Sequence, residues 1–287
     1  MRANKPILQA PDHTVLAKQH YENFPVASVV LPKRLRYPIA LIYHFARCAD
    51  DFADEGNLTQ FERLALLQHY VDEIDIINNV GNSNSAFFTE LAQMIKDNQL
   101  PLAPFYDLLD AFKQDVTKTH YANFDEVLDY CNRSANPIGR LLLYLFNKAT
   151  PENLTYSDCV CSALQLINFY QDIAIDYDAN AHQSRLYLCL DEMAQFGVTE
   201  QQIANKEMNQ NWVQFMQFNI ERAEIMLQKG KPLARILPGR MGLEMRLIIG
   251  GGETIIRKLK KVNGDIFNRR PTVKAWDWPY IFLKAFI

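Results

Sequence analysis

The amino-acid sequence predicts an all-α fold in a single domain that covers residues 1–287. Apolar residues recur at the spacing of amphipathic helices along nearly the whole chain. None of the loop signals between these segments is long enough to separate two domains. The composition, with 48% hydrophobic and 22% charged residues, is that of a globular protein with a sizeable core.

Loop signals divide the first half of the chain into helices. A short helix near 12–22 precedes the others. The segment Asn78 to Ser85, rich in Asn, Gly and Ser, separates two of them. Pro137 predicts a kink in the last helix of this half, because proline has no N–H for the helical hydrogen bond. The longer predicted helices of this half cover about 35–54, 59–79, 84–98, 102–116 and 124–148.

The second half contains three long helices and an aromatic tail. Predicted loops at Thr150–Asn153 and Asp178–Ser184 flank a helix over about 156–178, and two more follow over about 208–229 and 240–262. A Gly250-Gly251-Gly252 triplet interrupts the last of these. It favours close contact between helices over room for a long apolar tail.

A final helix over about 273–285 lies in an aromatic tail that begins at Trp276. We expect this tail to pack on the core, and contact with a membrane interface is the alternative. Arg269 and Arg270, just before it, are expected to be solvated, and contact with diphosphate or lipid headgroups is the alternative.

Charge and cysteine content disfavour several classes of protein. The net charge of −3 argues against a nucleic-acid-binding protein, which would usually be basic. The five cysteines form no C-x-x-C pair, which indicates reduced thiols in a cytoplasmic protein. The first 18 residues contain no apolar stretch typical of a signal peptide, and the longest apolar run, Leu141 to Phe146, is too short to span a bilayer.

Two acidic clusters, far apart in the sequence, carry the functional signal. In each, two aspartates lie four residues apart and therefore share one face of a helix. Like charges at this spacing repel each other, so a helix would not carry them for its own stability. Two such faces turned toward each other would form an oxygen-lined site for divalent cations, which hold phosphates. The first cluster consists of Arg47, Asp50, Asp51 and Asp54. The second consists of Gln165, Asn168, Asp172 and Asp176.

The composition of the two clusters favours a phosphate site over an ordinary solvated helix face. Each mixes carboxylates with a cation or an amide that can hold phosphate oxygens, and neither shows the Glu/Lys alternation of a plain surface. Magnesium bound there would make a diphosphate a better leaving group. The carbocation left behind needs a dry pocket with aromatic faces, for which Tyr43 and Tyr130 are the candidates.

Other types of site are poorly supported. No E-x-x-H sequence accompanies any of the six histidines, which disfavours a di-iron bundle. The chain also contains no H-E-x-x-H, P-loop or G-x-S-x-G motif.

The acidic motifs resemble those of trans-isoprenyl diphosphate synthases of the squalene/phytoene synthase type. The match rests on Arg47-x-x-Asp50-Asp51-x-x-Asp54 and on Gln165-x-x-Asn168-x-x-x-Asp172-x-x-x-Asp176, and it continues in Tyr130-Cys131 and Arg185-x-Tyr187. Three further strings are similar to the HpnC branch of bacterial hopanoid pathways. They are His20 to Ser28, Ser134 to Arg140 and Phe196 to Val198. The resemblance covers about His20 to Pro271.

The resemblance implies an isoprenoid-synthase-type helical bundle around a central apolar cavity, with two or three magnesium ions. Asp51 would support the first cluster, and Tyr130 would guide the cation. The segment between Asp176 and Arg185 is longer than is usual for the family, so a surface position for Arg185 is the alternative. The implied magnesium ligands are Asp50, Asp54, Asp172 and Asp176. The implied diphosphate contacts are His20, Arg47, Gln165, Asn168 and Arg185.

The HpnC branch implies a specific reaction. Presqualene diphosphate is ionised, the cation rearranges, and water quenches it to hydroxysqualene, so NADPH is not expected. One alternative is the head-to-head condensation of two farnesyl diphosphates to presqualene diphosphate or squalene. Another is an inactive helical protein that only binds prenyl diphosphates or another enzyme of the squalene pathway. The expected location is the cytoplasm, with peripheral contact at the inner membrane face and association with other squalene-pathway enzymes as further hypotheses.

Overall fold

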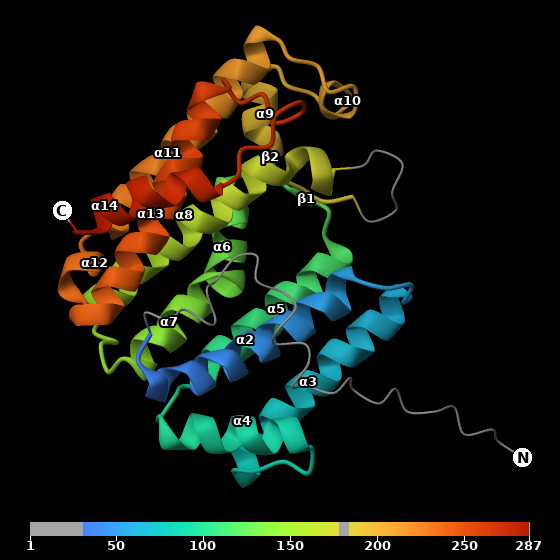
Figure 1. Cartoon of the computed structure of the whole chain (residues 1–287). Coiled ribbons are helices and arrows are strands. Elements are labelled where there is room, and N and C mark those ends of the chain that lie inside the picture. The colour runs from blue at the N-terminus through green and yellow to red at the C-terminus, as the bar shows by residue number, and fades with distance from the viewer. Residues whose placement is uncertain (1–30, 178–183, 287) are drawn as a thin grey trace, which may run out of the picture.

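Helices dominate the computed structural model, which describes residues 31–177 and 184–286 (Figure 1). The first half contains α2 (Lys33–Asp54), α3 (Gln60–Val80), α4 (Ala86–Asp97), α5 (Ala103–Thr117), α6 (Phe124–Ser134) and α7 (Asn136–Leu145). The second half contains α8 (Pro151–Asp176), α9 (Leu190–Phe196), α10 (Glu200–Ala204), α11 (Gln210–Gly230), α12 (Leu233–Ile236), α13 (Gly239–Lys261) and α14 (Trp278–Phe286). The predicted all-α fold is therefore confirmed.

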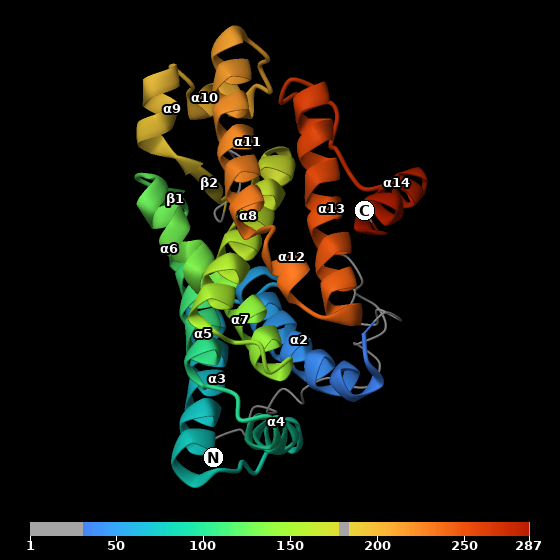
Figure 2. The same cartoon turned by 90° about the vertical axis from the view of Figure 1, so that its left-hand side faces the viewer.

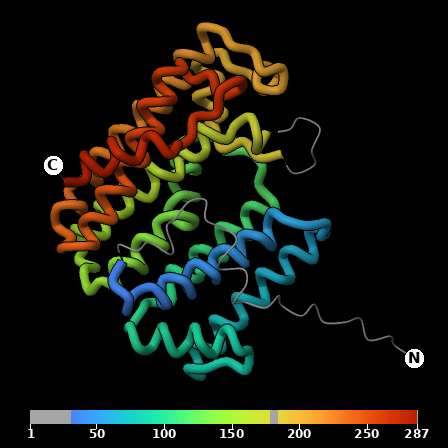
Figure 3. Tube along the Cα trace, in the orientation of Figure 1, coloured from blue at the N-terminus to red at the C-terminus, as the bar shows by residue number. Residues whose placement is uncertain are grey.

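The helices form two groups, each with its own hydrophobic core (Figure 3). The first core lies among α2, α3, α4, α5 and α7 and includes Phe45, Leu67 and Leu108. The second lies among α8, α11 and α13 and includes Tyr170 and Trp212. Helix α7 joins the two groups, because it packs against α2 and α5 on one side and against α8 on the other. The acidic helices α2 and α8 thus belong to different cores.

Most predicted helix boundaries agree with the structure to within a few residues. The loop signal around Gly81 is one example, since α3 ends at Val80 and Gly81 adopts a left-handed backbone with φ of 82°. At the other end of α3, the Thr59 side chain accepts the N–H of Glu62, and the Glu62 carboxylate accepts the N–H of Thr59. This reciprocal cap fixes the start of the helix.

The prediction of one helix over 124–148 was wrong. Two helices, α6 and α7, meet at Ala135, and Pro137 lies in the first turn of the second one. Proline is tolerated there but not inside a helix, where its ring would clash with the carbonyl of Arg133. The apolar periodicity correctly predicts helical structure in this region, but Pro137 begins a new helix and does not bend a continuous one.

The prediction of a loop at Thr150–Asn153 was also wrong. Helix α8 already begins at Pro151, and the Thr150 hydroxyl accepts the N–H of Asn153 at 3.2 Å. A threonine followed by proline is a helix-start signal as well as a loop signal. The correction lengthens α8 by about a turn and makes it the longest helix in the described part of the chain.

Several short elements were not predicted. They include α9, α10, α12 and the two strands β1 (His120–Tyr121) and β2 (Leu186–Cys189), which form a parallel pair. Segments this short leave too little periodicity to detect. The helix expected over 273–285 begins only at Trp278, after a 3₁₀ turn over Ala275–Asp277. The helix expected near 12–22 lies outside the described residues.

The glycine triplet lies inside an unbroken α13 and brings neighbouring helices close. A Cβ atom on Gly252 would lie 2.8 Å from Cδ2 of Leu164 in α8, and one on Gly250 would lie 3.1 Å from Cγ2 of Ile281 in α14. At Gly251 the same atom would meet open space. The expected close contact between helices is confirmed at two of the three positions.

Two further expectations concern cysteines and membrane spans. All five cysteines are free thiols. Within residues 31–177 and 184–286, every helix is too short or too polar to cross a lipid bilayer.

Candidate active site

Helix α2 presents the first acidic cluster on the side that faces away from its own core. Phe45 and Ala49 are fully buried on the core side. Arg47 pairs along the helix with Asp50 at 3.3 Å and with Asp51 at 2.8 Å. The apolar side of α2 therefore fixes the direction in which these acids point.

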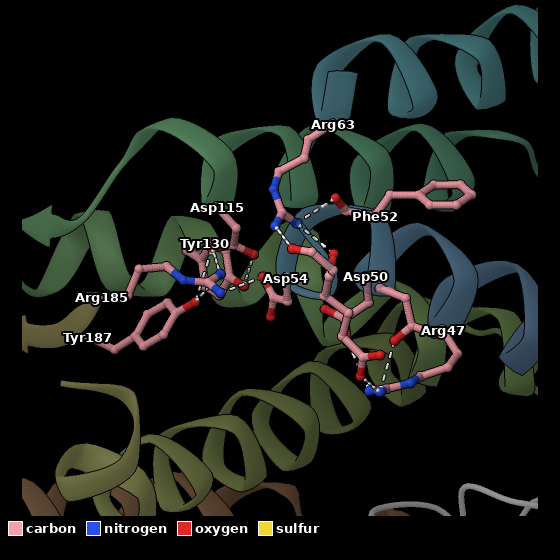
Figure 4. Close-up of polar contacts among 12 residues, drawn as sticks. Arg47, Asp50, Phe52, Asp54, Arg63, Asp115, Tyr130, Arg185 and Tyr187 are labelled. Atoms are coloured by element: carbon pink, nitrogen blue, oxygen red, sulfur yellow. Dashed lines mark hydrogen bonds and ion pairs between the residues drawn. The ribbon is translucent and has the colours of Figure 1, made fainter. Parts of the chain in front are cut away.

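The end of α2, where Asp54 lies, is held by an arginine from α3. The buried Arg63 guanidinium donates to the carbonyl oxygens of Phe52 at 3.0 Å, Glu55 at 3.1 Å and Gly56 at 2.8 Å (Figure 4). The last carbonyls of a helix have no partners within the helix itself. Arg63 satisfies the carbonyl of Phe52 in the last turn and those of Glu55 and Gly56 just after it, and so positions the end of α2.

Helix α8 presents the second cluster in the same way. Ile167, Tyr170 and Ile173 are buried in the second core, and the polar residues occupy the other side. Arg270 holds Asp172 by two hydrogen bonds, from Nε at 2.6 Å and from a terminal nitrogen at 3.1 Å. Arg270, which we expected to be solvated, therefore pairs with a predicted metal ligand.

The two clusters meet across one cavity of about 230 Å³. The cavity lies where the two groups of helices face each other, and it also receives side chains from α5, α6 and β2. The lining consists of Asp50, Asp54, Asp115, Tyr130, Gln165, Asn168, Phe169, Asp172, Asp176, Arg185 and Tyr187. The geometric prediction that two distant acidic helices converge on one hollow is thus met.

Asp115 of α5 organises one wall of the cavity. Its carboxylate accepts hydrogen bonds from the hydroxyls of Tyr130 at 2.6 Å and Tyr187 at 3.0 Å (Figure 4). Arg185 lies 3.3 Å from the same carboxylate and forms a second ion pair with Asp54. Arg185 therefore links α2 to β2 across the cavity and is not a surface arginine.

Aromatic rings form the adjoining part of this wall. The rings of Phe169 and Tyr187 are parallel, with centroids 3.9 Å apart, and the ring of Tyr130 lies 5.3 Å from that of Tyr187. Aromatic faces stabilise cations without attacking them. The acids and the aromatic faces thus border the same space.

The cavity carries an excess of negative charge, with five aspartates and one arginine in its lining. Burial and the neighbouring Asp54 carboxylate raise the pKa of Asp50 to about 7. Burial and Asp172 raise the pKa of Asp176 to about 6. Carboxylates that repel each other in a confined space are hard oxygen donors suited to a divalent cation.

The carboxylates are not drawn together into a finished coordination sphere. In the described part of the chain, no three Asp, Glu, His or Cys side chains converge as metal ligands. Arg185 and Arg270 instead neutralise Asp54 and Asp172. The residues fit a divalent cation by their chemistry, and the arginines hold two of the candidate ligands.

A second, apolar pocket of about 30 Å³ lies between α7, α8 and α13. Leu164 of α8 lines it, directly before Gln165, which lines the acidic cavity. The N-terminal part of α8 therefore borders the apolar pocket, and its C-terminal part borders the acidic cavity. The remaining lining residues of the apolar pocket are Gly139, Leu142, Leu143, Phe146, Ser157, Val160, Cys161, Met245 and Ile248.

The structure places the predicted site residues in three groups. Eight of them line the acidic cavity: Asp50, Asp54, Tyr130, Gln165, Asn168, Asp172, Asp176 and Arg185. Arg47, Asp51 and Tyr43 are half-buried on α2 but do not belong to its lining. His20 lies outside the described residues. The roles assigned to all these residues stay predictions.

Asp115 and Phe169 also line the cavity but were missed by sequence reasoning, and Tyr187 was not among the predicted site residues. A signal for Asp115 existed. It shares the apolar face of α5 with Leu108, Ala111 and Phe112, all buried. An acid on the buried face of a helix needs partners, so this position indicates a polar network. No comparable signal marks Phe169, because aromatic residues are common in cores.

Comparison with known proteins agrees with these observations. The sequence model described as squalene/phytoene synthase matches residues 17–277. The hydroxysqualene synthase of Rhodopseudomonas palustris is 33% identical over 243 residues, which are 83% of this chain and 80% of that protein. The hydroxysqualene synthase of Sinorhizobium fredii is 30% identical over 245 residues, 85% of this chain and 81% of that protein. The structure of squalene synthase HpnC from Alicyclobacillus acidocaldarius has a TM-score of 0.79 and 31% identity, with 88% of this chain and 92% of that chain covered. With its acidic helices meeting at one cavity, the chain therefore belongs to the squalene/phytoene synthase family of enzymes.

Proposed function

We propose that this enzyme ionises presqualene diphosphate with the help of magnesium and converts it to hydroxysqualene. The observation that carries the proposal is the meeting of both acidic helices and an aromatic wall at one cavity. The relatives named hydroxysqualene synthase, at 30% and 33% identity, support the choice of reaction within the family.

The acidic cavity would receive the diphosphate. Asp50, Asp54, Asp172 and Asp176 would hold magnesium, which when bound stabilises negative charge on the departing diphosphate oxygens. Asn168 and Gln165 lie on the same side of α8 as two of these acids, and their amides can donate to phosphate oxygens. Arg185 supplies a guanidinium, which matches phosphate oxygens in geometry and charge.

The apolar part of the substrate would lie along the other surfaces. The diphosphate leaves with the electron pair of its C–O bond, and the resulting cation would lie against Tyr130, Phe169 and Tyr187. The apolar pocket beyond Leu164 would receive part of the hydrocarbon chain. Water would then add to the rearranged cation and lose a proton, which gives the alcohol.

Incubation with presqualene diphosphate and magnesium tests the proposal. We expect mass spectrometry of the extract to show hydroxysqualene, two mass units heavier when the reaction is run in ¹⁸O-water. Addition of EDTA should stop turnover. If presqualene diphosphate is not consumed, the proposal is wrong.

The alternative is the head-to-head condensation of two farnesyl diphosphates. The matching structure from Alicyclobacillus acidocaldarius is named a squalene synthase, which favours this candidate. Farnesyl diphosphate, supplied with and without NADPH, separates the two. Conversion of farnesyl diphosphate to presqualene diphosphate or squalene would establish the condensation. Conversion of presqualene diphosphate to hydroxysqualene, with farnesyl diphosphate left unconsumed, would establish the first proposal.

A further inference from the structure

Helix α14 buries only a narrow stripe of its surface. Ile281 and Ala285 are buried in a small cluster with Leu247 of α13. Figure 2 shows α14 on the outer side of α13, away from α8 and α11. The other large apolar side chains of the tail form what we call the α14 aromatic face. Its members and their exposed fractions are Trp276 (71%), Trp278 (45%), Tyr280 (42%), Phe282 (42%), Leu283 (64%) and Phe286 (74%).

This exposure is unusual for a helix of such composition. A helix that is apolar on nearly all sides is normally buried, and a contiguous exposed apolar patch marks an interaction surface. The types of residue narrow the choice of partner. Tryptophan and tyrosine are enriched at the boundary between lipid headgroups and acyl chains, and phenylalanine and leucine insert below it.

The charge of the same segment is opposite to that of the whole protein. Residues 253–287 contain eight lysines and arginines and three acids, Glu253, Asp265 and Asp277, whereas the complete chain has a net charge of −3. A basic segment next to an apolar helix face is attracted to anionic lipid headgroups.

Cationic side chains lie beside the aromatic rings. Lys274 lies 5.0 Å from the centre of the Trp276 ring, and Arg257 lies 4.6 Å from that of Tyr280. Lys284, on α14 itself, lies 5.4 Å from the same tyrosine ring and also pairs with Glu253 at 3.2 Å. The positive groups therefore border the exposed rings, as at a membrane interface.

We propose that α14 docks this protein on an anionic lipid surface, with the α14 aromatic face at the headgroup boundary and the neighbouring cations on the lipid phosphates. The helix would lie in the plane of the interface and not cross the bilayer. On its other side, α13 contributes Met245 and Ile248 to the apolar pocket. The docked surface would thus lie one helix away from that pocket.

Sedimentation of the full chain with vesicles tests the proposal. We expect binding to vesicles of phosphatidylcholine with about one third phosphatidylglycerol, and weaker binding to phosphatidylcholine alone. The combined change Trp276→Gln, Leu283→Gln and Phe286→Gln should lower partitioning into the anionic vesicles by about tenfold or more. Turnover of substrate dispersed in detergent should not change, which shows that the variant is folded.

A matched control removes exposed apolar residues from other surfaces. Phe61→Gln, Val80→Gln and Ile225→Gln replace three side chains that are 81%, 75% and 57% exposed on α3 and α11. This variant should bind vesicles like the wild type. An equal loss of binding in the control would overturn the proposal, because the α14 aromatic face would then have no special role.

Tryptophan fluorescence reports the contact directly. The chain has three tryptophans, and Trp212 is fully buried in the second core. A blue shift on addition of anionic vesicles should therefore come from Trp276 and Trp278, and it should disappear in the double variant Trp276→Phe and Trp278→Phe. A full chain that does not bind anionic vesicles would refute the proposal. A dimer that the glutamine variant converts to monomers would refute it as well, since a second copy would then cover the face.

Discussion

A single buried carboxylate, that of Asp115, connects most of the groups on one wall of the cavity. It accepts hydrogen bonds from the hydroxyls of Tyr130 and Tyr187. It also forms an ion pair with Arg185, which forms a second ion pair with Asp54. A buried charge is tolerated only when it is paired and hydrogen-bonded. The network therefore fixes the positions of two aromatic rings and one guanidinium together.

The pH dependence of stability should reveal this carboxylate. Burial raises the pKa of Asp115 from 3.8 to about 6, although Arg185 opposes the shift. The folded protein thus holds this proton more tightly than the unfolded chain, so the stabilising contribution is complete below pH 3.8 and is lost as the pH rises through 6. Relative to Asp115→Asn, the wild type should lose about 1–3 kcal/mol of unfolding free energy between pH 4 and pH 7.5.

Urea unfolding in EDTA at several pH values measures this difference. The exposed Asp97→Asn serves as the control and should follow the wild type. If the unfolding free energies of the wild type and Asp115→Asn change with pH in parallel, the pKa of Asp115 is not raised in the folded protein.

The second cluster can be tested at Asp172. An amide keeps the shape of the side chain and can still accept from Arg270, but it removes the negative charge needed for a cation. Asp172→Asn should lower turnover by about a hundredfold or more and leave the melting temperature nearly unchanged. Asp72→Asn, on the exposed surface of α3, is the matched control. Wild-type rates in Asp172→Asn would mean that the second cluster is ordinary surface.

At the scale of elements, the end of α2 depends on Arg63. Methionine at this position fills a similar volume but donates no hydrogen bond, so the carbonyls of Phe52, Glu55 and Gly56 would lose their partner. We expect Arg63→Met to lower the unfolding free energy by about 2–4 kcal/mol. Turnover of the folded fraction should fall too, because Asp54 lies in the released turn.

Thermal unfolding and single-turnover rates check this expectation, with the exposed Arg34→Met as the control. Arg63→Lys should recover part of the stability, since an ammonium can still reach some of the carbonyls. If Arg63→Met is as stable as the wild type, the cap is unimportant.

Two glycine-to-alanine substitutions in the second group of helices should change the unfolding free energy in opposite directions. A Cβ atom on Gly230 of α11 would lie 2.7 Å from the carbonyl oxygen of Tyr156 and 2.9 Å from the backbone nitrogen of Val160. Gly230→Ala should therefore destabilise by about 1–3 kcal/mol. Gly251→Ala, in open space within α13, should stabilise by about 0.5–1 kcal/mol. Denaturant unfolding of both variants measures these changes. Equal changes in unfolding free energy would contradict the packing of α8 against α11.

The sequence predicts long elements well and their junctions less well. Helix α2 could be predicted because its polar and apolar sides differ along its whole length. Pro137 and Thr150 were misread because each is compatible with two local structures. A proline either bends a helix or begins one, and a threonine before proline either lies in a loop or caps a helix. Tertiary packing, which the local sequence does not contain, decides between them.

At the scale of the whole molecule, the cavity is a junction between two hydrophobic cores. The spacing of the aspartates predicts that each acidic face is special, and the resemblance to a family predicts that the two faces meet. The arginines that pair with the aspartates could not be predicted, because they are distant in the sequence. Arg270 lies 98 residues from Asp172, and Arg185 lies 131 residues from Asp54. Contacts this distant depend on the complete arrangement of helices.

A ligand that bridges the junction should stabilise both halves together. Magnesium with inorganic pyrophosphate, at a hundred times its dissociation constant, should add about 3 kcal/mol to the unfolding free energy and raise the melting temperature by several degrees. Magnesium alone or pyrophosphate in EDTA should have much smaller effects. Thermal melts check this expectation. The melting temperature of the wild type should rise with magnesium and pyrophosphate, and that of Asp172→Asn should not. An equal shift with pyrophosphate in EDTA would show that the arginines bind it without metal.

The pairing of Arg185 with Asp54 and of Arg270 with Asp172 has a further consequence for how such a site fills. Two guanidinium groups act as internal counter-ions, so the acids can face each other before any metal arrives. The binding of a metal ion there would then exchange one positive charge for another. An arginine displaced by a metal would be released beside a bound diphosphate, where its guanidinium could hold phosphate oxygens.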